Sequence, residues 1–340
     1  MGWFSAYSPS CPCISVGNIA WGGTGKTPLT GWLLDWAEKQ GIKAVVLSRG
    51  YGANPGTRPL LVSADTPVER SGDEPLLLAR AFPKASVVVF PRRSEAARFA
   101  ENHLSPDLLI LDDGMQHLQV RRDADLVLLC PEDFTREWNR VIPSGPWREG
   151  PSALSSASAF AIKADAEKFA SVSSAAQERL ASYGKPLFSF SLIPLGLRPL
   201  SPEQGQEMLS PDIYRKNPYI LLSGVGNPLG VEETARTLLG REPVQHFDFD
   251  DHHRYSAVEI QALLKIAGVP LPLVCTAKDA VKLEHLGDIW GLTPVWVMET
   301  RVEFGPWLDF SEDGHASGGF SGWWEKWWTE QTGRSFERLA

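Results

Sequence analysis

The chain has 340 residues, which at about 150 residues per domain suggests two domains, each long enough to bury a core. The 33 Lys and Arg residues face 41 Asp and Glu residues, so the formal charge is −8, whereas a general nucleic-acid-binding protein needs a basic surface. Hydrophobic residues make up 43% and charged residues 22% of the chain, and these fractions exclude a disordered protein.

No apolar run approaches the ~18 residues that a membrane-spanning helix needs. The first residues, MGWFSAYSPSCPC, lack the basic and apolar regions of a secretory signal. The 4 cysteines are too few for a disulfide scaffold. Cys11 and Cys13 form a C-x-C pair without a second pair at metal-binding spacing, which favours two reduced thiols and a cytoplasmic setting.

Short runs rich in Val, Ile and Leu alternate with helical patterns in the first half of the chain. The expected strands are 14–16, 44–47, 86–90, 108–111, 126–129 and 160–162, and the expected helices include 28–40 and 94–103. Continuous apolar strands that alternate with helices are typical of a parallel sheet covered on both faces. We therefore predict an α/β fold with a doubly wound parallel sheet.

A second, smaller α/β unit is expected in the second half. Its expected strands are 186–192, 219–223, 273–276 and 295–298, with helices over 231–239 and from about 277 to 281. Segment 194–211 is rich in Pro and Gly and is predicted to be a loop. A Gly/Ser-rich connector, 314–322, precedes the end of the chain.

The strongest local signal is GNIAWGGTGKT at residues 17–27, between an expected strand and an expected helix. This context is typical of a P-loop, in which backbone N–H groups and the helix N-terminus bind phosphate. Lys26 would reach the β- and γ-phosphates and Thr27 would bind Mg²⁺. Ala20 stands where the pattern has its first Gly, and a Gly-rich turn with a solvated Lys is the alternative. The predicted nucleotide-binding residues are Gly22, Gly23, Thr24, Gly25, Lys26 and Thr27.

Two carboxylates, Asp112 and Asp113, follow the expected strand 108–111. Acids at the carboxyl end of a parallel strand beside a P-loop hold Mg²⁺ directly or through water. An ordinary Asp-Gly turn is the alternative, but the nearby P-loop favours the metal. Gln116 and His117 could face the same region.

Nine motifs in chain order together resemble the tetraacyldisaccharide 4'-kinase family of the lipid A pathway. They are Val16-Gly-Asn, Gly22-Gly-Thr-Gly-Lys-Thr-Pro28, Ser48-Arg-Gly-Tyr-Gly52, Ser71-Gly-Asp-Glu-Pro75, Pro91-Arg-Arg-Ser94, Asp112-Asp-Gly-Met-Gln-His117, Pro143-Ser-Gly-Pro-Trp-Arg-Glu149, Phe249-Asp-Asp-His-His-Arg-Tyr255 and Thr276-Ala-Lys-Asp279. The resemblance implies ATP-dependent phosphorylation of the 4'-hydroxyl of an acylated glucosamine disaccharide lipid, at the cytoplasmic face of the inner membrane.

The resemblance also implies two α/β/α lobes joined by a two-stranded linker, whose strands we place near 189–192 and 297–302. The first lobe would comprise residues 1–188 plus 304–340, and the second residues 189–303. The end of the chain would then return to the first lobe.

The resemblance assigns roles to individual residues. Asp73 is the implied catalytic base, His252 its partner, and Arg93 an arginine directed at the γ-phosphate. A carboxylate paired with an imidazole can accept a hydroxyl proton near neutral pH. The alternatives are a helix N-cap for Asp73, a polar loop or metal site for His252 and its neighbours, and a solvated arginine for Arg93.

Three further positions carry weaker expectations. Tyr51 matches a family aromatic residue near the nucleotide and acceptor. Glu149 resembles an additional acid around Mg²⁺, and an exposed loop salt bridge is its alternative. Lys278 and Asp279 are expected to position the second lobe. The implied cofactors are ATP and Mg²⁺, and the implied partners are the lipid substrate and a membrane surface.

The segment before the P-loop strand is shorter than the hydrophobic anchor common in the resembled family, with Trp3, Phe4 and Tyr7 as its aromatic residues. Either the start is truncated or membrane contact is made elsewhere. Of the 13 Trp, four lie at i, i+1, i+4 and i+5 near the C-terminus, on one side of a predicted helix. This Trp cluster, Trp323, Trp324, Trp327 and Trp328, would either sit at the lipid headgroups or pack against the first lobe.

Two other functions are compatible with the P-loop alone. One is a P-loop kinase or ligase that acts on a soluble small molecule. The other is an ATP-dependent switch protein, which needs no acceptor base.

Overall fold

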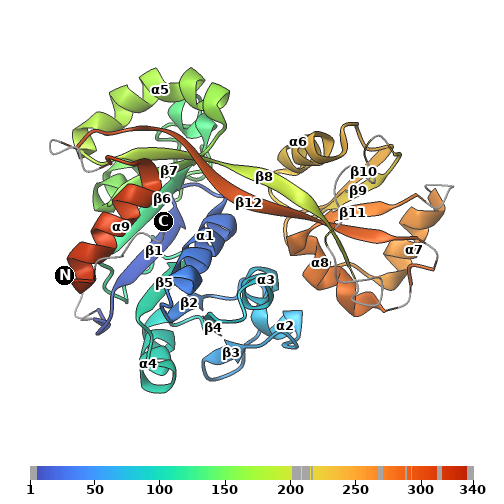
Figure 1. Cartoon of the computed structure of the whole chain (residues 1–340), viewed down its shortest axis with the longest axis horizontal. Coiled ribbons are helices and arrows are strands. Elements are labelled where there is room, and N and C mark those ends of the chain that lie inside the picture. Colours follow the sequence, from blue (N-terminus) through green and yellow to red (C-terminus); the bar gives the residue numbers. More distant parts are fainter. Residues whose placement is uncertain are drawn as a thin grey trace.

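A computed structural model describes residues 6–200, 208, 215, 217–266, 271–287, 289–291, 293–311 and 316–334. Within these residues one sheet of 12 strands has the order β10-β9-β11-β12-β8-β7-β6-β1-β5-β2-β4-β3 (Figure 1). The strands are β1 (Cys13–Asn18), β2 (Ala44–Ser48), β3 (Leu60–Val62), β4 (Ser86–Val89), β5 (Leu108–Asp112), β6 (Ala124–Leu129), β7 (Ala159–Lys163), β8 (Leu187–Pro199), β9 (Ile220–Ser223), β10 (Gln245–Asp248), β11 (Leu273–Thr276) and β12 (Val295–Leu308). The helices are α1 (Lys26–Lys39), α2 (Val68–Ser71), α3 (Asp73–Ala81), α4 (Arg93–Leu104), α5 (Ala166–Leu180), α6 (Pro228–Leu239), α7 (Ala257–Ile266), α8 (Ala277–Leu283) and α9 (Gly319–Thr332).

The first lobe is wound in two directions from its central strand. Strand β1 pairs in parallel with β5 on one side and β6 on the other. The sheet then continues through β2 and β4 beyond β5, and through β7 beyond β6. Ile14 packs with α1 on one face, whereas Cys13 packs with α4 on the other. Both faces are therefore covered, and the predicted doubly wound α/β fold is confirmed.

The lobes are joined by two long strands, β8 with 13 residues and β12 with 14. They pair in antiparallel fashion from Leu187–Leu308 at one end to Pro199–Trp296 at the other. At its first-lobe end β8 pairs in parallel with β7, and at its second-lobe end β12 pairs in parallel with β11. The sheet is thus continuous through the predicted two-stranded linker (Figure 1).

Two boundaries expected in the second half are wrong. Residues 194–199 continue β8 rather than opening a loop, and β12 extends ten residues beyond the expected end at 298, to Leu308. Pro194 is accommodated because the β8–β12 register shifts between Glu299 and Thr300, and Thr300 is the residue opposite it. Pro is tolerated at such irregularities since it cannot donate a ladder hydrogen bond. Most of 201–211 lies outside the described residues.

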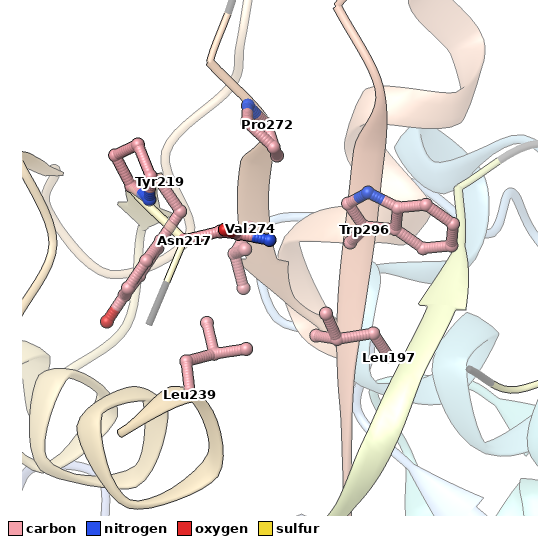
Figure 2. A pocket seen from close by; sticks show the side chains of 8 residues that line it. Leu197, Asn217, Tyr219, Leu239, Pro272, Val274 and Trp296 are labelled. Atoms are coloured by element: carbon pink, nitrogen blue, oxygen red, sulfur yellow. The ribbon is translucent and has the colours of Figure 1, made fainter. Parts of the chain in front are cut away.

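The second lobe consists of β9, β10 and β11 with helices α6, α7 and α8 (Figure 1). Between α6 and the β8–β12 pair lies an apolar hollow, to which Leu197, Leu239, Val274 and Trp296 contribute (Figure 2). The eight residues that line it include no carboxylate and no imidazole. The hollow is therefore part of the packing of this lobe and carries none of the chemistry expected from the sequence.

The Trp cluster lies on α9 and packs in the core of the first lobe. Trp324 and Trp328 are 0% exposed, and their rings meet the ring of Trp36 on α1 edge-on at centroid distances of 5.1 and 5.5 Å. Trp323 and Trp327 are 7% and 8% exposed. Of the two alternatives for the Trp cluster, packing against the first lobe is the one observed, because each ring buries its surface inside the protein.

Two other expectations lie wholly or partly outside the described residues. Trp3 and Phe4 are not described. The expected connector 314–322 is not described at 314–315, and from Gly319 it is already helix α9. Within the described residues no helix is both long and apolar enough to cross a membrane.

Replacing Trp324 with Ala should lower the free energy of unfolding by about 3–5 kcal/mol, because it empties a fully buried aromatic site. Trp307→Ala is the control, since Trp307 is 44% exposed. Denaturant titration followed by circular dichroism measures both variants. Equal, small losses in the two variants would contradict the core role of the Trp cluster.

Candidate active site

The P-loop lies between β1 and α1 and is held by two neighbouring segments. Ala20 is buried and forms a β-bridge with Trp147, and the Trp21 N–H donates to the carbonyl of Pro146 at 2.8 Å. This bridge explains why Ala stands where the P-loop pattern has Gly. Gly25 has φ +94°, and a Cβ there would lie 2.8 Å from the ring of Phe190, so this position requires Gly.

Lys26 is the first residue of α1, and its ammonium is held above the loop. It donates to Asn18 Oδ1 at 2.8 Å and lies 3.4 Å from Asp113 Oδ1. Thr24 is buried, and its hydroxyl has no hydrogen-bond partner within the described structure. Thr27 lies half-buried in the first turn of α1. The loop therefore presents a cation and two hydroxyls where phosphate oxygens and a metal ion would bind.

Asp112 and Asp113 lie side by side at the end of β5 but in different electrostatic environments. Asp112 is 3% exposed, and burial, together with the charges of Glu74 and Asp113, raises its pKa to about 7. Burial also acts to raise the pKa of Asp113, but Lys26 and Arg148 outweigh it and hold that pKa below its usual value. Arg148 reaches both oxygens of Asp113 at 3.2 Å.

The acid pair fits a magnesium ion. Asp112 accepts a hydrogen bond from Ser48 at 3.3 Å through Oδ2, while its buried Oδ1 has no partner among the described residues. A divalent cation would satisfy that oxygen and remove the repulsion between the two carboxylates. No group of three or more His, Cys, Asp or Glu side chains forms a metal cage in the described part of the chain. Mg²⁺ commonly binds through one or two carboxylates plus phosphates and water, so this arrangement suits it.

The motif that ends in Glu149 also brings Arg148 into the site. Glu149 is exposed and makes no hydrogen bond or ion pair to any described residue. Its neighbour Arg148 points into the site, where it pairs with Asp113 and donates to Gln116 at 3.1 Å. The sequence did not single out Arg148, because the turn decides which of two adjacent side chains faces Asp113.

Arg93 is fully buried beneath the acid pair. Its guanidinium donates to the carbonyl of Phe90 at 2.9 Å and to the carbonyl of Asp112 at 3.3 Å. Burial lowers its pKa to about 10, although Asp112 and Asp113 act in the opposite direction. The solvated alternative is wrong for Arg93 and correct for Arg92, which is exposed and pairs with Glu95.

Asp73 and His252 meet across the two lobes, 179 residues apart in the sequence. His252 Nδ1 lies 2.9 and 3.0 Å from the two carboxylate oxygens of Asp73, which is 6% exposed. Asp73 is the first residue of α3, and Gly72, with φ +85°, holds the N-cap position. The N-cap alternative for Asp73 is therefore wrong.

The protonation of this pair is set by its surroundings. Burial acts to raise the pKa of Asp73, but the hydrogen bond from His252 and the charge of Lys278 bring it below its usual value. The hydrogen bond to Asp73 raises the pKa of His252 above 6.5, against the effect of burial. Near neutral pH the pair thus holds an ionised carboxylate beside an imidazole that titrates above its ordinary range.

The neighbouring histidine, His253, bonds within the second lobe rather than to Asp73. His253 Nε2 lies 3.0 Å from Glu259, and its ring stacks on Phe249 within the second lobe. The metal-site alternative for residues 250–253 is not supported, because the two histidines bond to different carboxylates on different elements.

Lys278 links the second lobe to the pair. Its ammonium lies 2.9 Å from Glu74, 2.8 Å from Asp251 and 3.9 Å from Asp73. Burial acts to lower the pKa of Lys278, yet these acids raise it above the ordinary lysine value. Asp279, which is 0% exposed, instead accepts hydrogen bonds from the Gly224 N–H and the Tyr255 hydroxyl inside the second lobe.

Three other contacts join the two lobes near the Asp73–His252 pair and the P-loop. A Cβ on Gly226, in the β9–α6 loop, would lie 3.0 Å from the backbone nitrogen of Gly23 in the P-loop. The exposed ring of Tyr51 lies 5.1 Å from the ring of His252. Arg80 of α3 pairs with Glu284, just beyond α8. The P-loop and the Asp73–His252 pair therefore both lie where the lobes meet, and the contact of Asp113 with Lys26 joins the acid pair to the P-loop.

A P-loop lysine, two carboxylates and an acid–imidazole pair at one interface define a P-loop phosphotransferase. Residues 1–312 match the LpxK family model, described as tetraacyldisaccharide-1-P 4'-kinase. The chain belongs to this family, as its sequence motifs predicted.

Similar proteins carry the same family name. The chain is 46% identical to the tetraacyldisaccharide 4'-kinase of Oleidesulfovibrio alaskensis over 97% of this chain and 90% of that protein. It is 46% identical to that of Nitratidesulfovibrio vulgaris over 95% and 86% of the two chains. The structure of LpxK from Aquifex aeolicus in complex with ATP is similar with a TM-score of 0.67 and 28% identity, covering 89% of this chain and 87% of that one.

Proposed function

We propose that this chain transfers the γ-phosphoryl group of ATP to the 4'-hydroxyl of the tetraacyldisaccharide 1-phosphate precursor of lipid A. The observation that carries the proposal is the Asp73–His252 pair, which lies at the same interface as Lys26 and Asp113. An ATP-dependent switch would need no such pair. Family membership favours the lipid acceptor over a soluble small molecule.

The reaction forms a bond between the 4'-oxygen and the γ-phosphorus and breaks the bond from that phosphorus to the oxygen bridging it to the β-phosphate. ADP leaves with that bridging oxygen, and the hydroxyl proton passes to the protein. Backbone N–H groups of residues 22–25 and the ammonium of Lys26 bind the phosphates and stabilise charge on the departing ADP.

Thr27, Asp112 and Asp113 would hold Mg²⁺, which supplies positive charge to the β- and γ-phosphate oxygens when bound. Arg148 would remain beside Asp113 and add a second positive charge at that edge. Arg93 positions Asp112 through its carbonyl, and its direct contact with the γ-phosphate stays a prediction. Glu149 as a further metal ligand also stays a prediction.

Asp73 and His252 act together as the base. The carboxylate of Asp73 fixes the imidazole through Nδ1, and the pair takes up the hydroxyl proton as the 4'-oxygen attacks. Lys278 keeps Asp73 ionised and holds the two lobes at the distance that this pair requires. Tyr51, beside His252, would contact the acceptor sugar.

Asp73→Asn and His252→Gln should each lower kcat by about 10²–10⁴-fold, because they remove proton uptake. Both variants should still bind ATP. The assay uses ATP, Mg²⁺ and the disaccharide lipid in detergent, with the gain of one phosphate read by mass spectrometry. His253→Gln is the matched control and should keep near-normal turnover. Absence of phosphorylated lipid with the unaltered protein would overturn the proposed function.

The pH profile of the same reaction should rise through the pKa of His252. That pKa is raised above 6.5, and only the neutral imidazole can receive a proton, so kcat/KM is low below this pKa and increases as the pH passes it. The rising limb should disappear in His252→Gln. A profile that is flat from about pH 5 to 8 in the unaltered enzyme would mean that Asp73, whose pKa is lowered, accepts the proton without His252.

We further propose that the first lobe comprises residues 1–188 plus 304–340 and the second residues 189–303, with catalysis between them. The continuous β8–β12 pair supports this division. The acceptor lipid places the enzyme at a membrane surface, at the cytoplasmic face of the inner membrane, where ATP is available.

Flotation with vesicles that contain the disaccharide lipid tests this placement. The enzyme should rise with vesicles that carry the substrate, because its acyl chains stay in the bilayer while the sugar is bound. Vesicles without the substrate are the control. An enzyme that phosphorylates the lipid in detergent but never floats with such vesicles would contradict the placement.

A further inference from the structure

A lysine that the sequence analysis did not single out lies on the other side of the P-loop from the acid pair. Lys163 is the last residue of β7, and it is directly opposite Phe190 of β8 in the parallel register. Its Cδ lies 3.6 Å from the position that a Cβ on Gly25 would take. Lys163 and Phe190 therefore both border the P-loop residue that precedes Lys26.

The ammonium of Lys163 has no hydrogen-bond acceptor and no ion-pair partner among the described residues, although the side chain is half-buried. Burial lowers its pKa. The titratable groups around it are Cys130, Lys168 and Glu233, and Glu233 is already paired with Lys168 at 3.1 Å. A cation in this position is stabilised little by the protein itself, which is the situation expected where an anionic ligand supplies the opposite charge.

The charges of both lysines act on one thiol. Cys130 follows β6, the strand between β1 and β7, and burial raises the pKa of its thiol to about 12, while the charges of Lys163 and Lys26 both act to lower it. Since Lys163 also borders Gly25, the residue before Lys26, the two lysines flank the same stretch of the P-loop and can act on the same phosphate chain.

The direction of the nucleotide follows from the strand order. Ligands of doubly wound sheets bind at the carboxyl ends of the strands, at the point where the winding reverses, which here is β1. The acids and the Asp73–His252 pair lie on the side of β5, β2 and α3, so the γ-phosphate must point that way. The α-phosphate and the nucleoside then lie toward β6 and β7, where Lys163 is the cation at the strand end.

We propose that Lys163 is a nucleotide-binding residue whose ammonium binds the α-phosphate end of a nucleoside di- or triphosphate. This inference rests on the proposed kinase function for the orientation of the nucleotide. Lys26 and Lys163 then hold the two ends of the phosphate chain, and Lys163 serves binding of ATP and ADP rather than proton transfer.

Titration calorimetry with ADP and with inorganic phosphate tests the assignment. Lys163→Met keeps the apolar stem against the P-loop and removes only the charge. It should weaken ADP binding at least tenfold but inorganic phosphate binding less than threefold, because a single phosphate bound in the P-loop does not extend to the α-phosphate position. Lys163→Arg should restore most of the ADP affinity, and KM for ATP should rise in Lys163→Met with kcat within about twofold.

Lys185→Met is the matched control, because Lys185 is half-buried just before β8 begins, near the start of β7, whereas Lys163 is the last residue of β7. Its ADP affinity should stay within twofold of that of the unaltered protein. Unchanged ADP affinity in Lys163→Met, or an equal loss for ADP and inorganic phosphate, would overturn the assignment. If Lys163→Met does not fold, Lys163→Gln is carried through the same titrations with the same criteria. Binding is measured without acceptor. A failed lipid assay, together with the expected difference between ADP and inorganic phosphate in Lys163→Met, would therefore reject the lipid substrate and keep this site.

Discussion

The hydrogen bond between Asp73 and His252 is the constraint on which the rest of the site depends. It joins residues on two lobes, so it forms only when the lobes have one particular relative orientation. The antiparallel β8–β12 pair sets that orientation, since the sheet passes through it without interruption. Lys278 reinforces the same geometry, because it contacts Glu74 on one lobe and Asp251 on the other.

The electrostatics of this interface depend on the positions of individual charged residues rather than on the net charge of −8. Asp112 and Asp113 are adjacent, but the first carboxylate has no ion pair within the described residues and its pKa is raised to about 7, while the second is held by Lys26 and Arg148. The two carboxylates therefore differ in charge state near neutral pH, and Asp113 fixes the position of the Lys26 ammonium. An acidic protein can bind an anionic nucleotide and an anionic lipid because its cations are concentrated at these few atoms.

The sequence predicted the parts of the fold that depend on local periodicity and chain order. The parallel strands of the first lobe, the P-loop and the acids after β5 follow from apolar runs and glycine spacing, and the family resemblance supplied the linker and the pairing of Asp73 with His252. Features decided by distant packing were not predictable. Arg148 rather than Glu149 faces Asp113, and Pro194 stays in β8 because of an irregularity on its partner strand. Lys163 was missed because one lysine at a strand end forms no pattern.

The Trp cluster shows most clearly why local pattern leaves such choices open. Its spacing defines one face of a helix, but the spacing is the same whether that face meets lipid or protein. The protein surface that buries this face belongs to α1, which is distant in the sequence. There Trp36 contacts Trp324 and Trp328, and Trp32 contacts Phe320. Helix α1 begins at Lys26, so α9 fixes the helix that carries the phosphate-binding lysine. Trp324 and Trp328 of the Trp cluster therefore pack against the helix that begins with Lys26, and the burial of all four rings leaves them almost no surface for contact with lipid.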